Sequence, residues 1–255
     1  MLVLAIGDII GKPGREAVKE LLPDLKQQYG LDLVIANGEN VAGGLGLTSN
    51  TAIELLDAGV DVLTSGNHIW AHKEIIPYLD SEMPILRPLN YPPGVAGRGY
   101  LIKKHAAVVN LIGRTFIGDF DCPFRAMDQL IAELEPKPPV IIVDFHAEAT
   151  SEKMALGRYL DGRVSAMLGT HTHVGTIDIQ LLPRGTAYVT DIGMTGPINS
   201  VIGDDTESVL QRFLTALPHR LSVARGKTML NAVLVKLDDK SGKAISIDRI
   251  YREVE

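Results

Sequence analysis

The sequence predicts an α/β fold in which helices cover the faces of a mostly parallel β-sheet. Apolar runs of strand length alternate with segments of helical period, a pattern typical of such sheets. The 255 residues suffice for one large domain, and no Pro/Ser-rich or single-charge tract marks a linker. The hydrophobic share of 45% supplies an ample core. We therefore expect residues 1–255 to form a single domain.

Six apolar runs are expected to be strands, and six segments with helical period are expected to be helices. The strands are Leu2–Ile6, Leu33–Ala36, Val60–Thr64, Ala106–Leu111, Val140–Phe145 and Val164–Leu168. The helices are Arg15–Tyr29, Ser49–Asp57, Lys73–Leu79, Arg125–Glu135, Glu152–Leu160 and Asp205–Leu214. A glycine or proline stops most of these helices.

Two pairs of segments in the C-terminal half are expected to be antiparallel hairpins, because each pair flanks a short turn sequence. They are Ile177–Leu182 with Ala187–Thr190, and Asn231–Leu237 with Ala244–Ile250. The Pro- and Gly-rich stretch at residues 87–100 predicts a long loop. Such a loop is either a binding loop or lid, or a plain surface excursion.

Composition and charge exclude several classes of protein. The formal net charge of −6 argues against binding to long nucleic acid, which depends on Lys and Arg neutralising phosphates. The first residues lack a basic n-region and their apolar run is too short for a signal peptide, so none is expected, and no segment reaches the roughly 20 apolar residues that span a bilayer. The one cysteine, Cys122, rules out an intrachain disulfide and thiolate metal clusters. A reducing cytoplasm is the expected location.

Five of the predicted strands end in side chains that can bind metals. These side chains are Asp8, Glu39, Asn40, Asn67, His68, His146, His171 and His173. Each one alone has a structural explanation, such as a helix cap, a turn or an interior histidine. Because ligands bind at the carboxyl ends of strands in an open α/β sheet, we expect all of them to lie on one rim. Together they predict a metal site.

The predicted ligands indicate the class of metal. Imidazole, carboxylate and amide groups without thiolate suit Fe, Mn, Zn or Co, and disfavour a structural zinc or a calcium cage. The candidates are too many for one tetrahedral ion and suit two ions roughly 3.5–4 Å apart. Two divalent ions with Asp8, Glu39 and a bridging hydroxide leave about one positive charge, which would attract a phosphodiester monoanion. We expect iron, with manganese and zinc as alternatives.

Several short motifs carry a family resemblance. Gly7–Asp8, Gly66–His68, His146 and Gly169–His173 resemble the successive blocks of the calcineurin-like metallophosphoesterases. The motifs GDIIGKPGR, NGEN, SGNHIW, DFHAEATSEK, GTHTHV and TDIGMTGP resemble the YmdB-type branch over most of the chain. This resemblance implies a sandwich of mostly parallel β-sheets flanked by helices, with C-terminal antiparallel hairpins.

Three positions depart from the wider superfamily. Ile10 stands where its first block has a histidine, Glu39 stands where a bridging aspartate is usual, and Ile69 replaces the acid after Gly-Asn-His. These departures are also what the YmdB-type branch shows. They therefore direct the assignment toward that branch.

The resemblance also implies a role for each site residue. Glu39 would bridge two ions, one held with Asp8, Asn40 and His173, the other with Asn67, His146 and His171. His68 would be the general acid that protonates the leaving ribose oxygen, a step typically worth ~10²–10⁴-fold in rate. The alternative for His68 is a residue that orients a ligand. Glu148 is a candidate partner of His146, and Asn37 is interpreted as a turn residue.

The function implied is a dinuclear phosphodiesterase that hydrolyses small 2′,3′- or 3′,5′-cyclic nucleotides through a metal-bridging hydroxide. One rival is a regulatory protein that senses a nucleotide or partners an RNA-processing enzyme, with the metals mainly structural. Another is a dinuclear amidohydrolase or a phosphomonoesterase of the same fold. The resemblance alone favours a homo-oligomer.

Overall fold

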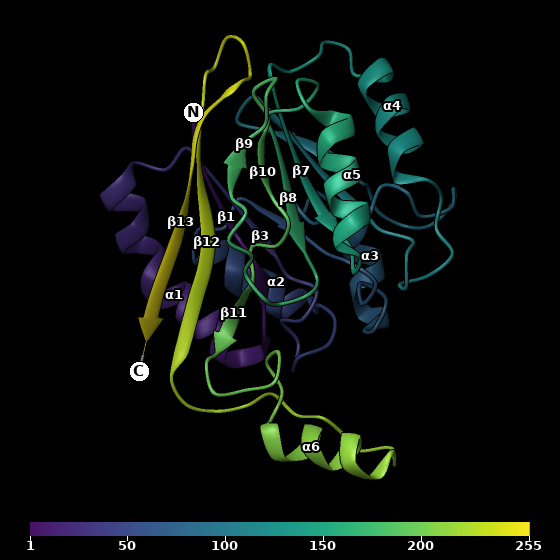
Figure 1. The fold of residues 1–255 in the computed structure, drawn as a ribbon, viewed down its shortest axis with the longest axis vertical. Coiled ribbons are helices and arrows are strands. Elements are labelled where there is room, and N and C mark those ends of the chain that lie inside the picture. Colours follow the sequence, from purple (N-terminus) through teal and green to yellow (C-terminus); the bar gives the residue numbers. More distant parts are fainter. Residues whose placement is uncertain (255) are drawn as a thin grey trace.

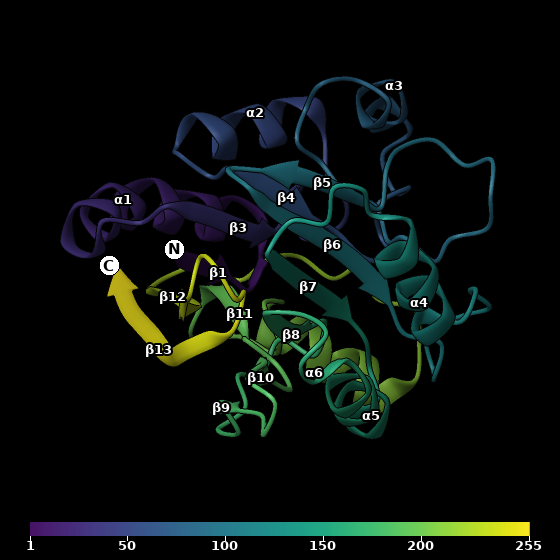
Figure 2. The ribbon, with the colours of Figure 1, turned by 90° about the horizontal axis from the view of Figure 1, so that it is seen from above.

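Two β-sheets pack face to face in the computed structural model, which describes residues 1–254, and helices cover the outer face of each sheet. In Figure 1 the strands of the two sheets run roughly vertically, and in Figure 2 the four layers are seen from above. The resulting order of layers is helices, sheet, sheet, helices. No helix in residues 1–254 is long and apolar enough to cross a membrane.

The first sheet contains strands from the N-terminal part and the C-terminal part of the chain. Its strands are β1 (Leu2–Ile6), β2 (Asp8–Ile9), β3 (Leu33–Asn37), β4 (Val62–Thr64), β11 (Met194–Pro197), β12 (Thr228–Leu237) and β13 (Ala244–Val254). The order is β2-β11-β12-β1-β3-β4, with β13 paired to β12. Strands β1, β3 and β4 are parallel, whereas β12 runs antiparallel to β1 and β13.

The second sheet is formed by the middle of the chain. Its strands are β5 (Tyr100–Lys103), β6 (Ala106–Ile112), β7 (Val140–His146), β8 (Ala166–Thr170), β9 (Gln180–Leu181) and β10 (Ala187–Val189). The order is β5-β6-β7-β8-β10-β9, in which β6, β7, β8 and β10 are parallel. The C-terminal ends of β6, β7 and β8 therefore lie at one edge.

The helices divide between the two outer faces. They are α1 (Gly11–Tyr29), α2 (Ser49–Asp57), the 3₁₀ turn η1 (Lys73–Ile75), α3 (Ile76–Leu79), α4 (Pro123–Glu133), α5 (Thr150–Leu160) and α6 (Thr206–Thr215). Helices α1 and α2 cover the first sheet and α4 and α5 cover the second (Figure 2), whereas α6 stands apart from the sandwich (Figure 1).

Strand β1 shows why the central strands read as continuous apolar runs. Its Val3 and Ala5 belong to the core between the two sheets, whereas Leu4 and Ile6 face the core under α1 and α2. Successive side chains of a strand point to opposite faces, so a strand covered on both sides needs apolar residues at every position. A third core lies between the second sheet and helices α4 and α5.

All six predicted strands and all six predicted helices are present, most of them with shifted ends, and the predicted helix Lys73–Leu79 is the 3₁₀ turn η1 followed by α3. Strand β8 ends at Thr170, two residues beyond the predicted end, because β7 pairs with it as far as His146. The predicted loop at residues 87–100 ends in an unpredicted strand, β5, which pairs with β6. Both predicted hairpins are confirmed. The apolar runs predicted one sheet, whereas the structure has two.

Candidate metal centre

The predicted site residues lie at the carboxyl ends of strands from both sheets. Asp8 begins β2, His146 ends β7, and the others follow strands: Glu39 and Asn40 follow β3, Asn67 and His68 follow β4, and His171 and His173 follow β8. Asp8, Glu39, Asn40 and His146 are buried. The edge where the two sheets meet therefore gathers carboxylate, amide and imidazole groups, as the strand-end pattern predicts.

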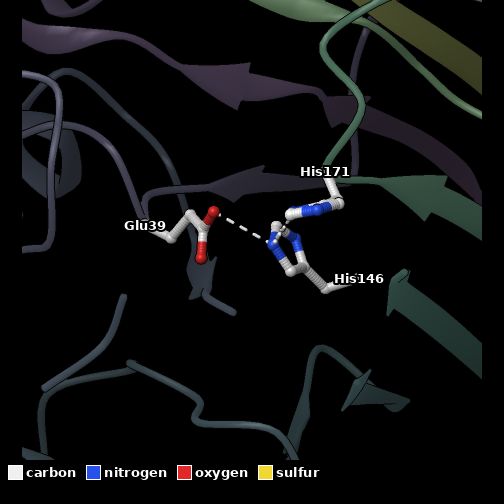
Figure 3. Close-up of side chains that lie close together, drawn as sticks. All are labelled: Glu39, His146 and His171. Atoms are coloured by element: carbon white, nitrogen blue, oxygen red, sulfur yellow. Dashed lines mark hydrogen bonds and ion pairs between the residues drawn. The ribbon is translucent and has the colours of Figure 1, made fainter. Parts of the chain in front are cut away.

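Glu39, His146 and His171 form the tightest group of donor atoms. One donor atom from each lies within 4.8 Å of the other two, close enough for all three to bind a single metal ion. Oε1 of Glu39 is 3.0 Å from Nε2 of His146, which is 3.0 Å from Nδ1 of His171. Figure 3 shows the carboxylate and the two rings pointing toward one another.

A second group of donors adjoins the first through Asp8. Oδ1 of Asp8 is 3.9 Å from Nε2 of His173 and 3.8 Å from Nδ1 of His146. The Asn40 amide nitrogen lies 3.2 Å from Nε2 of His173 and 3.3 Å from Oε1 of Glu39. A half-turn of this amide would present its oxygen, the atom that binds metals, to the same place. Glu39 thus contacts both groups, as a bridging ligand would.

Asn67 and His68 are half-buried residues that follow β4, and His68 contacts Glu39 through its backbone. The His68 backbone N–H donates to Oε2 of Glu39 at 3.2 Å, and the Asn67 amide nitrogen is 3.2 Å from Nε2 of His68. Oδ1 of Asn67 is buried and has no hydrogen-bond partner in residues 1–254. The half-buried ring of His68 is therefore held beside the carboxylate without taking a place among the three closest donors.

The charges of the site perturb Glu39 and His146 in opposite directions. Burial by itself would raise the pKa of Glu39, but the positive His146 and its hydrogen bond lower that pKa to about 2. Burial by itself would lower the pKa of His146, but Glu39, with help from Asp8 and Asp144, raises it to about 9. The carboxylate and the imidazolium therefore stabilise each other as an ion pair.

For Asp8 and His171, the neighbouring charges do not offset the effect of burial on the pKa. Burial raises the pKa of Asp8 to about 6, although His173 and His146 act in the opposite sense. Burial and the positive charge of His146 lower the pKa of His171 to about 3, so its ring is neutral at neutral pH. A buried carboxylate and a neutral imidazole are the forms of these side chains that bind metals.

The chemistry of these donors fits a metal centre. Oδ1 of Asp8 and Oδ1 of Asn67 are buried without a hydrogen-bond partner in the described chain, and both are potential ligand atoms. Burying such atoms unpaired costs free energy, and a cation among them would remove that cost. The absence of cysteine from the group favours metals that accept nitrogen and oxygen ligands.

The buried acid Asp144 sets the orientation of His146. Thr170 donates its hydroxyl to Oδ1 of Asp144 at 2.7 Å, so its oxygen is free to accept from Nδ1 of His146, 3.0 Å away. Nδ1 then carries a proton in both the charged and the neutral ring, and a metal ion bound at the site would take the place of the proton on Nε2. Neither Asp144 nor Thr170 was among the predicted site residues. The signal available was an acid inside the apolar run VIIVDFH.

The remaining rings have partners of their own. Nδ1 of His173 lies 2.7 Å from the carbonyl oxygen of Ile202, which leaves Nε2 facing Asp8. Oε2 of Glu148 lies 3.0 Å from Nε2 of His171, so its partner among the site residues is His171, where the sequence offered His146 as the less favoured of two interpretations beside a structural role. The cause is the position of Glu148 two residues beyond β7, where it meets the loop after β8.

Asn37 is more than the turn residue that the sequence suggests. The side-chain oxygen Oδ1 of Asn37 accepts the Glu39 backbone N–H at 3.1 Å, so the side chain closes a turn with the backbone two residues on. The side-chain nitrogen Nδ2 of Asn37 donates to Oδ2 of Asp144 at 3.1 Å. One buried amide therefore connects the loop of Glu39 with the acid that orients His146. The motif NGEN offered this amide, but its partner lies 107 residues away.

Gly66 provides a test of the packing of the site. A Cβ at this position would lie 2.2 Å from Cδ2 of His146 and 2.3 Å from Oε2 of Glu39, so Gly66→Ala must displace both. We expect it to weaken Mn²⁺ binding by about 10–100-fold, measured by chelator competition. Gly38→Ala is the control, because its Cβ would meet Leu63 at an ordinary 3.5 Å. Equal affinities in the two variants would contradict the described packing.

Comparison with known proteins agrees with the motifs. A family model described as YmdB-like protein matches residues 4–250. A Bacillus subtilis protein named 2′,3′-cyclic-nucleotide 2′-phosphodiesterase is 50% identical over 254 residues, which cover 98% of this chain and 96% of the relative.

Two solved structures share the fold over nearly the whole chain. A Thermus thermophilus structure, described as a hypothetical protein, has 47% identity and a TM-score of 0.93, and the match covers 99% of both chains. A Mycoplasma pneumoniae structure, described as a novel phosphatase, has 35% identity and a TM-score of 0.93, with 99% of this chain and 93% of that chain covered. The metallophosphoesterase fold expected from the motifs is confirmed, and the chain belongs to the YmdB-like family.

Proposed function

We propose that this protein is a metal-dependent phosphodiesterase that hydrolyses 2′,3′-cyclic nucleotides. The observation that carries the proposal is the convergence of Glu39, His146 and His171, from three separate strand ends, within coordinating distance of one another. The name of the Bacillus subtilis relative supports the choice of substrate, since half of all aligned positions are identical. Activity on 3′,5′-cyclic nucleotides is part of the proposal as a secondary activity.

We propose two metal ions, held by seven side chains of this chain. Glu39 contacts both groups of donors and would serve both ions, one with Asp8, Asn40 and His173, the other with Asn67, His146 and His171. Bound metals of this kind supply an activated water nucleophile and neutralise the charge of the phosphate. We propose iron as the native metal, with manganese and zinc as alternatives.

His68 is proposed to donate the proton that completes the reaction. Hydrolysis adds water across the bond between phosphorus and the 2′ oxygen, and the product is a nucleoside 3′-phosphate with a free 2′ hydroxyl. The 2′ oxygen needs a proton as the bond breaks. The His68 ring would give this proton and recover it from water; its partial exposure to solvent and the bond from the His68 backbone N–H to Glu39 support this role.

The chain's charge is consistent with a small substrate. Its net charge of −6 does not favour long nucleic acid, so attraction of phosphate depends on the site. We propose a cytoplasmic protein of one domain that acts on free cyclic nucleotides.

A panel of phosphate esters tests the proposed function. The protein is stripped with a chelator, reloaded separately with Fe²⁺, Mn²⁺ and Zn²⁺, and assayed on 2′,3′-cyclic AMP, 3′,5′-cyclic AMP, a linear dinucleotide and AMP. We expect 2′,3′-cyclic AMP to be hydrolysed fastest, to the 3′-phosphate. We expect the stripped protein to lose at least about 10³-fold in rate, because catalytic metals supply several kcal/mol. Full activity after stripping, or preferential hydrolysis of AMP, would overturn the proposal.

A further inference from the structure

A buried ion pair lies directly behind the two histidines of the GTHTHV motif. Nζ of Lys153, on α5, is 2.7 Å from Oδ2 of Asp191, and the exposed fractions of the two side chains are 0% and 1%. Neither residue contacts the group formed by Glu39, His146 and His171 through a hydrogen bond that the structure shows. A fully buried charge pair is costly to assemble and is weak evidence of a contribution to stability. Its position next to the site therefore calls for another explanation.

Asp191 uses its remaining hydrogen-bonding capacity on the residue between the two histidines. Oδ2 of Asp191 accepts the Thr172 hydroxyl at 2.8 Å and the Thr172 backbone N–H at 3.1 Å, in addition to Lys153. Oδ1 accepts the backbone N–H of Gly193 at 2.8 Å. The carboxylate thus holds Thr172 by both its side chain and its backbone.

The backbone on either side of Thr172 is in a conformation that needs such support. His171 has φ of 101° and His173 has φ of 66°, both in the region that side chains other than glycine rarely adopt. Residues in this region persist when surrounding contacts hold them there, and they cluster at functional sites. The bonds to Thr172 are contacts of that kind, because they fix the peptide groups that join the two histidines.

The backbone of Asp191 also bonds to Thr176, at the C-terminal end of the segment that starts at Thr172. The Thr176 N–H donates to the Asp191 carbonyl at 3.0 Å, and the Asp191 N–H donates to the Thr176 hydroxyl at 2.9 Å. The Met194 N–H donates to the His173 carbonyl at 3.0 Å. The segment from Thr172 to Thr176 is therefore tied at both ends to the segment that begins with Asp191.

We infer that Asp191, held in place by Lys153, is a positioning residue that holds Thr172 so that both flanking histidines face the metal centre. This inference rests on the proposed metal site, because it concerns the two histidines as ligands. Lys153 supplies the positive charge that a buried carboxylate requires, and its aliphatic stem lies against Gly169 of β8, where an added Cβ would be 3.3 Å from Cδ of Lys153. A positioning role predicts an effect on metal binding that a purely structural role does not.

Thr172→Val tests the inference with a change of one hydroxyl for one methyl group. We expect its affinity for Mn²⁺ to fall about tenfold, and the visible absorption spectrum of the Co²⁺-loaded protein to change, because the two imidazoles lose their shared constraint. Thr172→Ser keeps the hydroxyl and should restore both. Thr186→Val is the matched control, because the hydroxyl of this buried threonine bonds to Val164 and Gly162, away from the site, and the variant should bind Mn²⁺ as the parent does.

Asp191→Asn is a second variant, in which we expect Mn²⁺ affinity to fall on the order of 10–100-fold. If Asp191→Asn does not fold, the Thr172→Val variant still tests whether the bonds from Asp191 to Thr172 affect metal binding. Unchanged Mn²⁺ affinity and an unchanged Co²⁺ spectrum in Thr172→Val, in a protein whose parent binds metal, would overturn the inference alone. A parent protein that binds neither Mn²⁺ nor Co²⁺ would instead overturn the proposed function. The two failures are therefore distinguishable.

Discussion

Glu39→Gln is expected to reduce hydrolysis of 2′,3′-cyclic AMP by at least about 10³-fold, since catalytic metals contribute several kcal/mol of charge stabilisation. The substitution keeps the size of the side chain and an oxygen to accept the His68 N–H. It removes the negative charge that lies 3.0 Å from His146 and that would serve both metal ions. Steady-state kinetics and elemental analysis of the same preparation measure the loss of rate and the loss of metal together.

The control for this variant is Glu54→Gln, which changes a carboxylate on α2 that pairs with Arg15 at 2.7 Å outside the site. It should retain the parent's rate within about twofold, as expected of surface changes remote from the chemistry. Circular dichroism should show the same fold for both variants. Undiminished activity of Glu39→Gln after metal stripping and replacement would contradict the bridging role of Glu39.

His68→Ala is expected to lower kcat for 2′,3′-cyclic AMP by about 10²–10⁴-fold while leaving metal content unchanged, because general acid catalysis is typically worth that much. His68 does not belong to the closest donor group of Glu39, His146 and His171, so its ring can be removed without removing a ligand. A regulatory binding protein has no turnover to lose, and this variant therefore also separates the two classes of function.

The leaving group provides the decisive measurement for His68. A nitrophenyl phosphodiester releases an anion that is stable without a proton, so His68→Ala should slow its hydrolysis far less than that of the cyclic nucleotide. His72→Ala is the control, because this neighbouring ring bonds only to the Leu45 carbonyl, at 2.9 Å, in the described contacts. Equal losses on both substrates would indicate that His68 orients a ligand and does not donate a proton.

Much of the fold could be predicted because its signals are local. Strand β1 and helix α2 have the predicted bounds, Leu2–Ile6 and Ser49–Asp57. The helix begins where Thr48 and Thr51 form a reciprocal capping box, a signal contained in four residues. Strand β5 was missed because its four residues directly follow a Pro- and Gly-rich loop, and its pairing with β6 is what makes it a strand.

The location of the site could also be predicted, because the carboxyl ends of parallel strands meet at one edge whatever the details of packing. The side chains that support the site could not. Asp144 joins Asn37 across 107 positions, and Asp191 joins Lys153 across 38. An acid in an apolar run shows that a partner must exist, but nothing local identifies which residue it is.

The sequence by itself determined the α/β class, the strand ends that carry metal-binding side chains, and the family resemblance, since all three depend on residue types at short spacing. The tertiary structure confirmed the two packed sheets that the resemblance implied and that the apolar runs alone could not show, because both faces of β1 are apolar and either face could meet a sheet or a helix. It also decided which nitrogen of His146, His171 and His173 faces the site, because that choice depends on the hydrogen-bond partner each ring finds in the folded chain.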